Sequence, residues 1–152
     1  MSKLNLIVVG KLKDSHLEAI ELDYLKRIKN PELLIHEVKA NAENKEAESE
    51  ALLKKVKELS PNGTPYMIAL SEWGKVYSSK DFADWTQRII ERPHKVFFLI
   101  SGAEGFSDGL LKQCQEKISL SLLTFPHKLA RILLVEQMYR AETIRSGHPY
   151  HN

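Results

Sequence analysis

The last residues of the chain carry side chains that could act on a nucleic acid. They are Gly147-His148-Pro149-Tyr150-His151-Asn152. A tyrosine ring can stack on a base, and a histidine changes charge near neutral pH, so it can contact a phosphate or shuttle a proton. Chain ends ordinarily fray, but two histidines, an aromatic ring and a proline are an unusual composition for a tail without a function. No metal is expected, because helical His-x-x-x-His spacing is absent and no carboxylate lies nearby.

A second candidate is the loop Leu120-Ser121-Leu122-Leu123-Thr124-Phe125-Pro126-His127. It begins like a strand, but Pro126 cannot continue a central strand, and a helical pattern follows. Such a loop presents backbone N–H and C=O groups in an apolar setting, which suits an adenine ring. The alternative is an ordinary strand-to-helix connection in which Thr124 caps the helix.

A third candidate is the turn Ser101-Gly102-Ala103-Glu104-Gly105, which separates a strand pattern from a helix pattern. Its glycines could let the backbone approach a ligand closely, and amide donors would be exposed where the helix begins. The turn is neither a P-loop nor the full GxGxxG pattern. The alternative is a tight strand-to-helix turn that holds no ligand.

The last predicted helix, Leu129–Ile144, is apolar around most of its circumference. Such a helix must be buried in the core or against another chain, and we expect it to form part of a homodimer interface. Its polar residues Arg131 and Glu136 then need hydrogen-bond partners. Those partners lie across the interface, in the site, or within one subunit as an internal ion pair.

Strand and helix patterns alternate along the whole chain, and this alternation must position the three candidates. Aliphatic runs predict strands at Leu4–Val9, Leu33–Val38, Tyr66–Leu70, Val96–Ile100 and Ile118–Leu122. Helical spacing predicts helices near 17–28 and 43–58, after a cap at Ser78 or Ser79, and from Ser107 through Glu116. We therefore expect an α/β fold with a mainly parallel sheet and helices on both faces. Ligands bind such sheets at the carboxyl ends of the strands, here the loops after Leu70, Ile100 and Leu122.

Composition restricts the possible classes of protein. The 152 residues suit a single domain, residues 1–152, and their 43% hydrophobic and 28% charged content is ordinary for a globular protein. No apolar run could span a bilayer, and the N-terminus lacks the features of a secretory signal. The single cysteine, Cys114, excludes an intrachain disulfide and a cysteine-rich zinc site, and we expect it on a helix as core filler. We expect a cytoplasmic protein. A net charge of +2 does not indicate a strongly basic nucleic-acid binder.

Taken together and in order, these motifs resemble the RlmH family of SPOUT-class methyltransferases. The resemblance runs from Val8-Val9-Gly10-Lys11 near the start, through Phe98-Leu99-Ile100-Ser101-Gly102-Ala103-Glu104-Gly105-Phe106, to the Leu120–His127 loop. It continues through Arg131-x-x-x-x-Glu136-Gln137-x-Tyr139-Arg140-Ala141 and the terminal His148-Pro149-Tyr150-His151. It thus spans nearly the whole chain. The family usually has Gly-Gly where this chain has Ser101-Gly102. Some relatives extend with a basic residue after the Pro-Tyr-His, whereas this chain stops at Asn152.

The resemblance implies a fold, a cofactor and a reaction. The fold would be a SPOUT-type parallel sheet whose C-terminal part forms a trefoil knot. The reaction would be methylation of N3 of a pseudouridine in 23S ribosomal RNA, within the ribosome or large subunit, by a homodimer using S-adenosylmethionine and no metal. Cofactor-binding residues would be Leu70, Ser101, Gly102, Gly105, Leu120, Ser121, Leu122, Leu123, Thr124 and Phe125.

The resemblance also suggests which side chains serve catalysis. Arg131 or His127 would stabilise the anion that develops on the base, and Tyr150 with His151 would position the base, with the tail supplied by either subunit. Two alternatives remain at this point. One is a ribosome-associated binding module on the same scaffold without a cofactor. The other is a different α/β enzyme that uses a nucleotide at the same strand ends.

Overall fold

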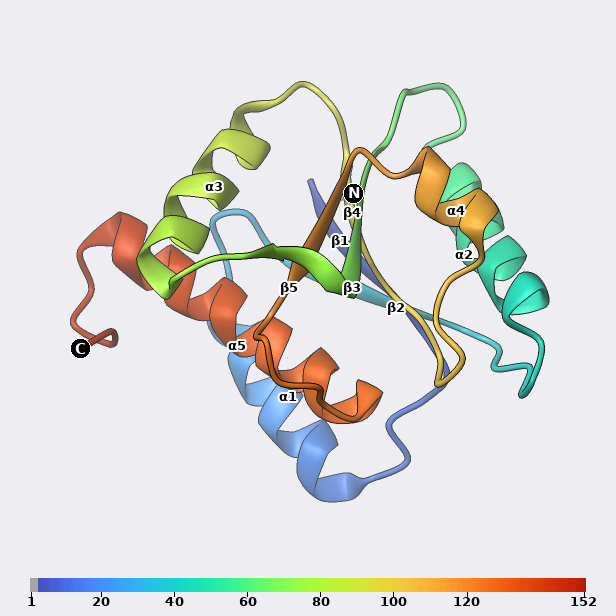
Figure 1. Cartoon of the computed structure of the whole chain (residues 1–152). Coiled ribbons are helices and arrows are strands. Elements are labelled where there is room, and N and C mark those ends of the chain that lie inside the picture. The colour runs from blue at the N-terminus through green and yellow to red at the C-terminus, as the bar shows by residue number, and fades with distance from the viewer. Residues whose placement is uncertain (1–2) are drawn as a thin grey trace.

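The computed structural model describes residues 3–152 as a parallel five-stranded sheet between two layers of helices (Figure 1). The strand order is β2-β1-β4-β3-β5, and every named pair is parallel. The strands are β1 (Leu4–Val9), β2 (Leu33–Val38), β3 (Tyr66–Val76), β4 (Val96–Ile100) and β5 (Glu116–Ser119). The helices are α1 (Ser15–Arg27), α2 (Lys45–Leu59), α3 (Ser79–Glu91), α4 (Asp108–Gln113) and α5 (His127–Ser146). The expected alternating parallel α/β fold is confirmed.

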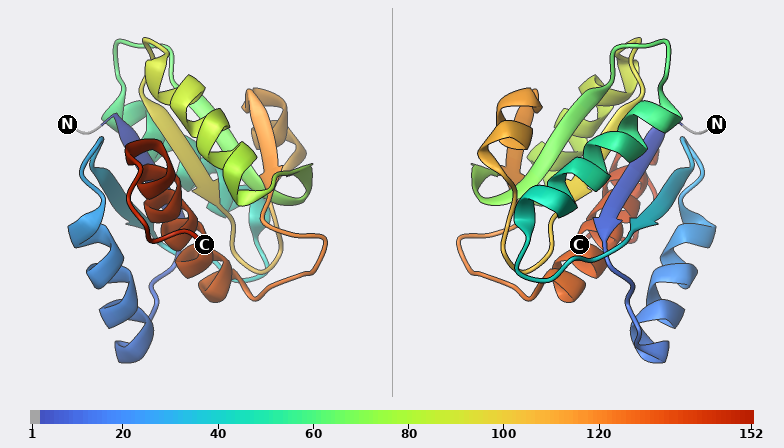
Figure 2. Two further views of the ribbon diagram at one scale, coloured as in Figure 1. Left: turned by 90° about the vertical axis from the view of Figure 1, so that its left-hand side faces the viewer. Right: turned by 90° about the vertical axis from the view of Figure 1, so that its right-hand side faces the viewer.

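Helices α1, α3 and α5 cover one face of the sheet, and α2 with α4 covers the other (Figure 2). Alternate residues of each buried strand serve the two layers, so Leu6 and Val8 join the core under α5, whereas Ile7 and Val9 join the core under α2. A strand that is apolar on both faces is what a sheet buried on both sides requires.

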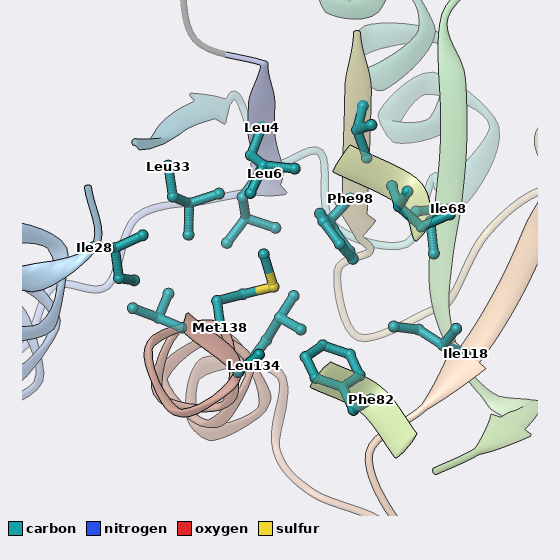
Figure 3. Close-up of a cluster of buried hydrophobic side chains, with 14 of the residues drawn as sticks. Leu4, Leu6, Ile28, Leu33, Ile68, Phe82, Phe98, Ile118, Leu134 and Met138 are labelled. Atoms are coloured by element: carbon teal, nitrogen blue, oxygen red, sulfur yellow. The ribbon is translucent and has the colours of Figure 1, made fainter. Parts of the chain in front are cut away.

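Helix α5 contributes to the larger of the two cores. Leu134 and Met138 point from it toward the side chains of β1, β3 and β4 (Figure 3). Its burial on this side is as expected from its apolar sequence. Leu129 and Leu133, four residues apart on another side of the helix, remain exposed.

Helix α4 and strand β5 have bounds that differ from the sequence prediction. Helix α4, capped by the Ser107 hydroxyl as expected, ends at Gln113, so Cys114 lies after the helix and is only partly buried. Strand β5 begins at Glu116 and ends at Ser119, because this segment pairs with Ile68–Leu70 of β3. The prediction of a strand over Ile118–Leu122 was therefore wrong at both ends, and the Leu120–Pro126 segment is entirely loop.

Strand β3 is longer than predicted and bends across β5 (Figure 1). Leu70 and Lys75 both pair with Ile118, so the four residues between them form an irregular crossing over that strand. Gly74 lies at the crossing, where a Cβ atom would stand 2.6 Å from the Cα of Ile118 and closer still to its N and carbonyl carbon. Only glycine lets the two backbones approach this closely.

Gly74→Ala should therefore lower the free energy of unfolding by about 2 kcal/mol, since backbone atoms must move to admit the methyl group. Urea denaturation would measure the change. Gly109→Ala is a matched control, because a Cβ there meets nothing closer than 4.0 Å. Equal stability of the two variants would contradict the close crossing.

No helix within residues 3–152 is long and apolar enough to cross a membrane.

Candidate functional site

A cavity of about 560 Å³ lies at the carboxyl ends of β3, β4 and β5. Three segments form its walls: Leu70–Trp73 after the first part of β3, Ile100–Phe106 after β4, and Ser119–His127 between β5 and α5. These are the loops at which a parallel sheet is expected to bind ligands. The predicted cofactor residues that line the cavity are Leu70, Ser101, Gly102, Gly105, Leu120, Ser121, Leu123, Thr124 and Phe125. Leu122 does not line it and is 91% exposed.

The Ser101–Gly105 turn needs its glycines for two different reasons. Gly105 has φ +83°, a left-handed conformation that strains any other residue. At Gly102 a Cβ would stand 2.7 Å from the buried Glu48 carboxylate, which accepts a hydrogen bond from the backbone N–H of Asn41 at 2.9 Å. Ser101 does not adopt a positive φ, so a serine is accommodated where the resembling family usually has glycine.

The Leu120–Pro126 loop is held by its own hydrogen bonds. The backbone N–H of Leu123 donates to the Ser121 hydroxyl at 3.0 Å, and Thr124 donates to Glu72 at 3.3 Å. Helix α5 begins beside the cavity with Pro126 as its N-cap and no side-chain cap, so the alternative in which Thr124 caps the helix is wrong. Pro126 therefore provides no capping side chain for the first N–H groups of α5, and these groups point toward this end of the molecule.

The loop that was expected to bind a ligand after Leu70 contributes three lining residues that were not named individually. Ser71, Glu72 and Trp73 follow Leu70 where β3 starts its crossing, and the Trp73 side chain is 85% exposed. The signal that could have identified them is their position directly after a predicted parallel strand. Glu72 brings a carboxylate to the cavity, and Glu104 of the glycine turn brings another.

The candidate catalytic residues do not all meet at this cavity. His127 lines it, but Arg131, one turn along α5, is 5% exposed and is not part of its wall. The Arg131 guanidinium donates to both Glu21 oxygens at 2.6 and 2.8 Å and to Glu37 at 2.7 Å. Burial alone would lower the pKa of Arg131, but the hydrogen bonds to the two carboxylates outweigh it and raise the pKa. Of the alternatives considered, the structure has the internal ion pair.

The terminal residues pack on the far half of α5 instead of entering the cavity of their own subunit (Figure 1). The Tyr150 ring lies edge-on to Tyr139, with centroids 4.7 Å apart, and its hydroxyl donates to Glu136 at 2.8 Å. His151 Nδ1 lies 2.8 Å from a guanidinium nitrogen of Arg140. Glu136 is nine residues after His127, or roughly 13 Å along the helix axis.

Burial, followed by hydrogen bonds with Tyr24 and Glu136, raises the pKa of Tyr150, so its hydroxyl stays protonated and donates to the carboxylate. Glu136 also pairs with Arg140 at 2.7 Å. Tyr150 and His151 of the tail are thus held against α5 by Glu136 and by its partner Arg140.

The chain is similar to known proteins over nearly its full length. Residues 2–151 match the family model described as "Predicted SPOUT methyltransferase". The "Ribosomal RNA large subunit methyltransferase H" of Phocaeicola vulgatus is 36% identical, over 99% of each chain. The protein of that name from Prochlorococcus marinus is 38% identical, over 99% of this chain and 97% of that one.

Two solved structures share the fold at low sequence identity. TrmJ from Z. mobilis superposes with a TM-score of 0.53 and 15% identity, covering 92% of this chain and 70% of that one. A probable methylase family protein from Haemophilus influenzae gives a TM-score of 0.52 and 12% identity, covering 98% and 68%.

Proposed function

The chain belongs to the SPOUT methyltransferase family, and from that premise we propose that it methylates N3 of a pseudouridine in the 23S RNA of the large ribosomal subunit, using S-adenosylmethionine. The observation that carries this proposal is the cavity at the carboxyl ends of β3, β4 and β5, whose walls are the segments that the sequence singled out. The enzyme would act as a single domain in the cytoplasm, where ribosomes are present.

The residues of the cavity suit S-adenosylmethionine. Leu70, Leu120 and Phe125 offer apolar surface to an adenine ring, and the Ser101–Gly105 turn brings backbone close to the ligand. Glu72 and Glu104 supply negative charge next to a ligand that carries cationic sulfur and ammonium groups. When bound, the cofactor supplies an electrophilic methyl group on its sulfonium.

The protein must then hold the N3 atom of the base in line with this methyl group and assist the loss of the proton from N3. His127 is the titratable candidate that lines the cavity, at the first turn of α5. We assign to His127 the contact either to the negative charge that develops on the base or to the proton that leaves N3. Arg131 is not needed for that contact, because its guanidinium is engaged by Glu21 and Glu37.

We further propose that the enzyme works as a homodimer in which the tail of one subunit completes the cavity of the other. The exposed Leu129 and Leu133 support an interface on α5 beside His127. Tyr150 and His151 support the exchange of tails, since within one subunit they pack away from the cavity. The close crossing of β3 over β5 at Gly74 supports a knotted path for the C-terminal part of the chain.

Calorimetric titration with S-adenosylmethionine tests the cofactor assignment. We expect micromolar binding by the wild type and, for Gly105→Ala, about five- to thirtyfold weaker binding, because the strained turn would relax at a cost of roughly 1–2 kcal/mol. Gly10→Ala is the matched control: it has φ +85° but lies outside the cavity wall, so it should lose stability without losing affinity.

Methylation of large subunits that lack the modification tests the reaction itself. Absence of cofactor binding by the wild type would favour the binding module, and binding of nucleotides alone would favour a different α/β enzyme. Equal affinity of the Gly105→Ala and Gly10→Ala variants would show that the cofactor does not touch the glycine turn.

A further inference from the structure

A second cavity, of about 430 Å³, lies beside the edge strand β5, at the end of α3. Tyr66, at the start of β3, and Glu116, at the start of β5, line it together with Trp85 of α3. The end of the β3 crossing adds Lys75 and Tyr77. Nothing in the proposed methyl transfer uses these residues.

The aromatic side chains of this cavity are fixed in place. The Glu116 carboxylate accepts hydrogen bonds from the Tyr66 hydroxyl at 2.5 Å and from Trp85 Nε1 at 3.0 Å. Tyr77 stacks on Trp85, with ring centroids 5.5 Å apart and planes at 30°. Burial, followed by the hydrogen bond to Glu116, raises the pKa of Tyr66 to about 12, so Tyr66 donates as a neutral phenol. Both oxygens of Glu116 are thereby occupied.

Cations outnumber carboxylates around these aromatic rings, since Glu91 and Glu116 also line the cavity. Lys75, Arg88 and Arg92 line the cavity, and none of them forms an ion pair with another residue in the range 3–152. Lys75 Nζ lies 4.9 Å from the Tyr77 ring centroid, and the Arg92 guanidinium carbon lies 4.6 Å from that of Tyr66. Cations that lie over aromatic rings and outnumber the carboxylates beside them favour an anionic ligand that also carries a flat ring.

The two cavities are joined by a short stretch of chain. Glu72 and Trp73 line the first cavity, while Lys75 and Tyr77 line the second. Two residues of extended chain span at most about 7 Å, so the backbones of Trp73 and Lys75, which line different cavities, lie close together, and the Trp73 side chain is exposed.

We propose that the second cavity binds a nucleotide of the RNA substrate that flanks the methylated residue. Lys75, Arg88 and Arg92 hold its phosphate, and Tyr77 offers a ring for its base. This assignment rests on the proposed function and extends it. It also answers a difficulty of that function, because a chain of net charge +2 needs a local cluster of cations to hold RNA by its backbone.

Charge reversal tests the assignment. We expect Lys75→Glu and Arg88→Glu each to weaken binding of a short oligouridylate about tenfold, measured by fluorescence anisotropy, and to reduce the slope of log affinity against log salt by about one. With unmodified large subunits as substrate, KM should rise while kcat at saturation stays close to the wild-type value. Lys54→Glu is the matched control, since Lys54 is exposed on α2 at the opposite face of the sheet.

Other outcomes decide against RNA at this cavity. If Lys75→Glu and Arg88→Glu bind oligouridylate as Lys54→Glu does, the assignment is wrong. If uridine monophosphate binds in a manner sensitive to Arg88 while RNA affinity is unaffected, the cavity serves a free nucleotide. If the two variants raise the KM for large subunits but bind oligouridylate normally, the second cavity contacts a ribosomal protein.

Failure of the proposed function gives a different result. A wild-type protein that neither binds S-adenosylmethionine nor methylates large subunits loses that function, whatever happens at Arg88. Retention of wild-type cofactor affinity in the Lys75→Glu and Arg88→Glu variants keeps the two questions apart.

Discussion

Replacing Glu21 with alanine should lower the free energy of unfolding by about 3–5 kcal/mol, which is a large part of the stability of a domain of this size. Glu21 accepts two hydrogen bonds from Arg131, and both side chains are less than a tenth exposed. Without Glu21 the guanidinium keeps only Glu37, whose side chain is 33% exposed. A buried charge without adequate compensation is among the most destabilising defects in a protein core. Urea denaturation followed by circular dichroism would measure the loss.

Asp23→Ala provides the matched control on the same helix. Asp23 pairs with Arg27 at 2.6 Å, but both side chains are well exposed, so its loss should cost about 1 kcal/mol or less. A Glu21→Ala variant no less stable than Asp23→Ala would contradict the internal ion pair.

A double variant of this ion pair distinguishes a structural role of Arg131 from a catalytic role. The double variant Glu21→Leu/Arg131→Met removes both buried charges, and such replacements are often neutral or stabilising. We expect it to regain most of the stability that Glu21→Ala loses and also to methylate large subunits at close to the wild-type rate. Recovered stability with lost activity would instead show that Arg131 acts on the substrate.

Sequence reasoning located the cavity because its walls follow from general rules. Parallel strands bring their carboxyl ends to one edge of a sheet, and the glycines of the turn indicate special backbone requirements, a close approach to Glu48 at Gly102 and a positive φ at Gly105. The partner of Arg131 could not be predicted in this way. Glu21 precedes Arg131 by 110 residues and lies in a helix rich in charged residues, where an acid is ordinarily solvent-exposed.

The crossing of β3 over β5 also could not be predicted from the sequence. Ser71-Glu72-Trp73-Gly74 has the composition of a turn, and local pattern does not reveal that the chain pairs again with Ile118 after it. The second cavity depends on this crossing, since Lys75 and Tyr77 reach Trp85 and Glu116 only through it. Residues that become neighbours through an irregular long-range pairing leave no periodic signal.

Removal of the five residues after Gly147 should reduce the rate of methylation of large subunits by about a hundredfold. Without the tail, the base is no longer held in line with the methyl group. The affinity for S-adenosylmethionine should stay within about twofold of the wild type, since the tail is assigned to the base and the residues assigned to the cofactor all lie between Leu70 and Phe125. Rapid-quench methylation and calorimetric titration measure the two quantities. Undiminished methylation would remove the tail from the site.

The same truncation decides which subunit's tail serves which cavity. A truncated subunit has an intact cavity but no tail, and a Gly105→Ala subunit has an intact tail but a weakened cavity. At low cofactor concentration, the homodimer of either variant should therefore have low activity. If tails are exchanged, a mixed dimer joins the sound cavity of one subunit to the sound tail of the other, and activity should return to about half that of the wild type. If each tail served its own subunit, the mixed dimer would contain no sound site and would stay inactive. Tyr150, held on α5 by Glu136 and Tyr139, would then have to leave those contacts and cross roughly 13 Å or more of helix during each cycle.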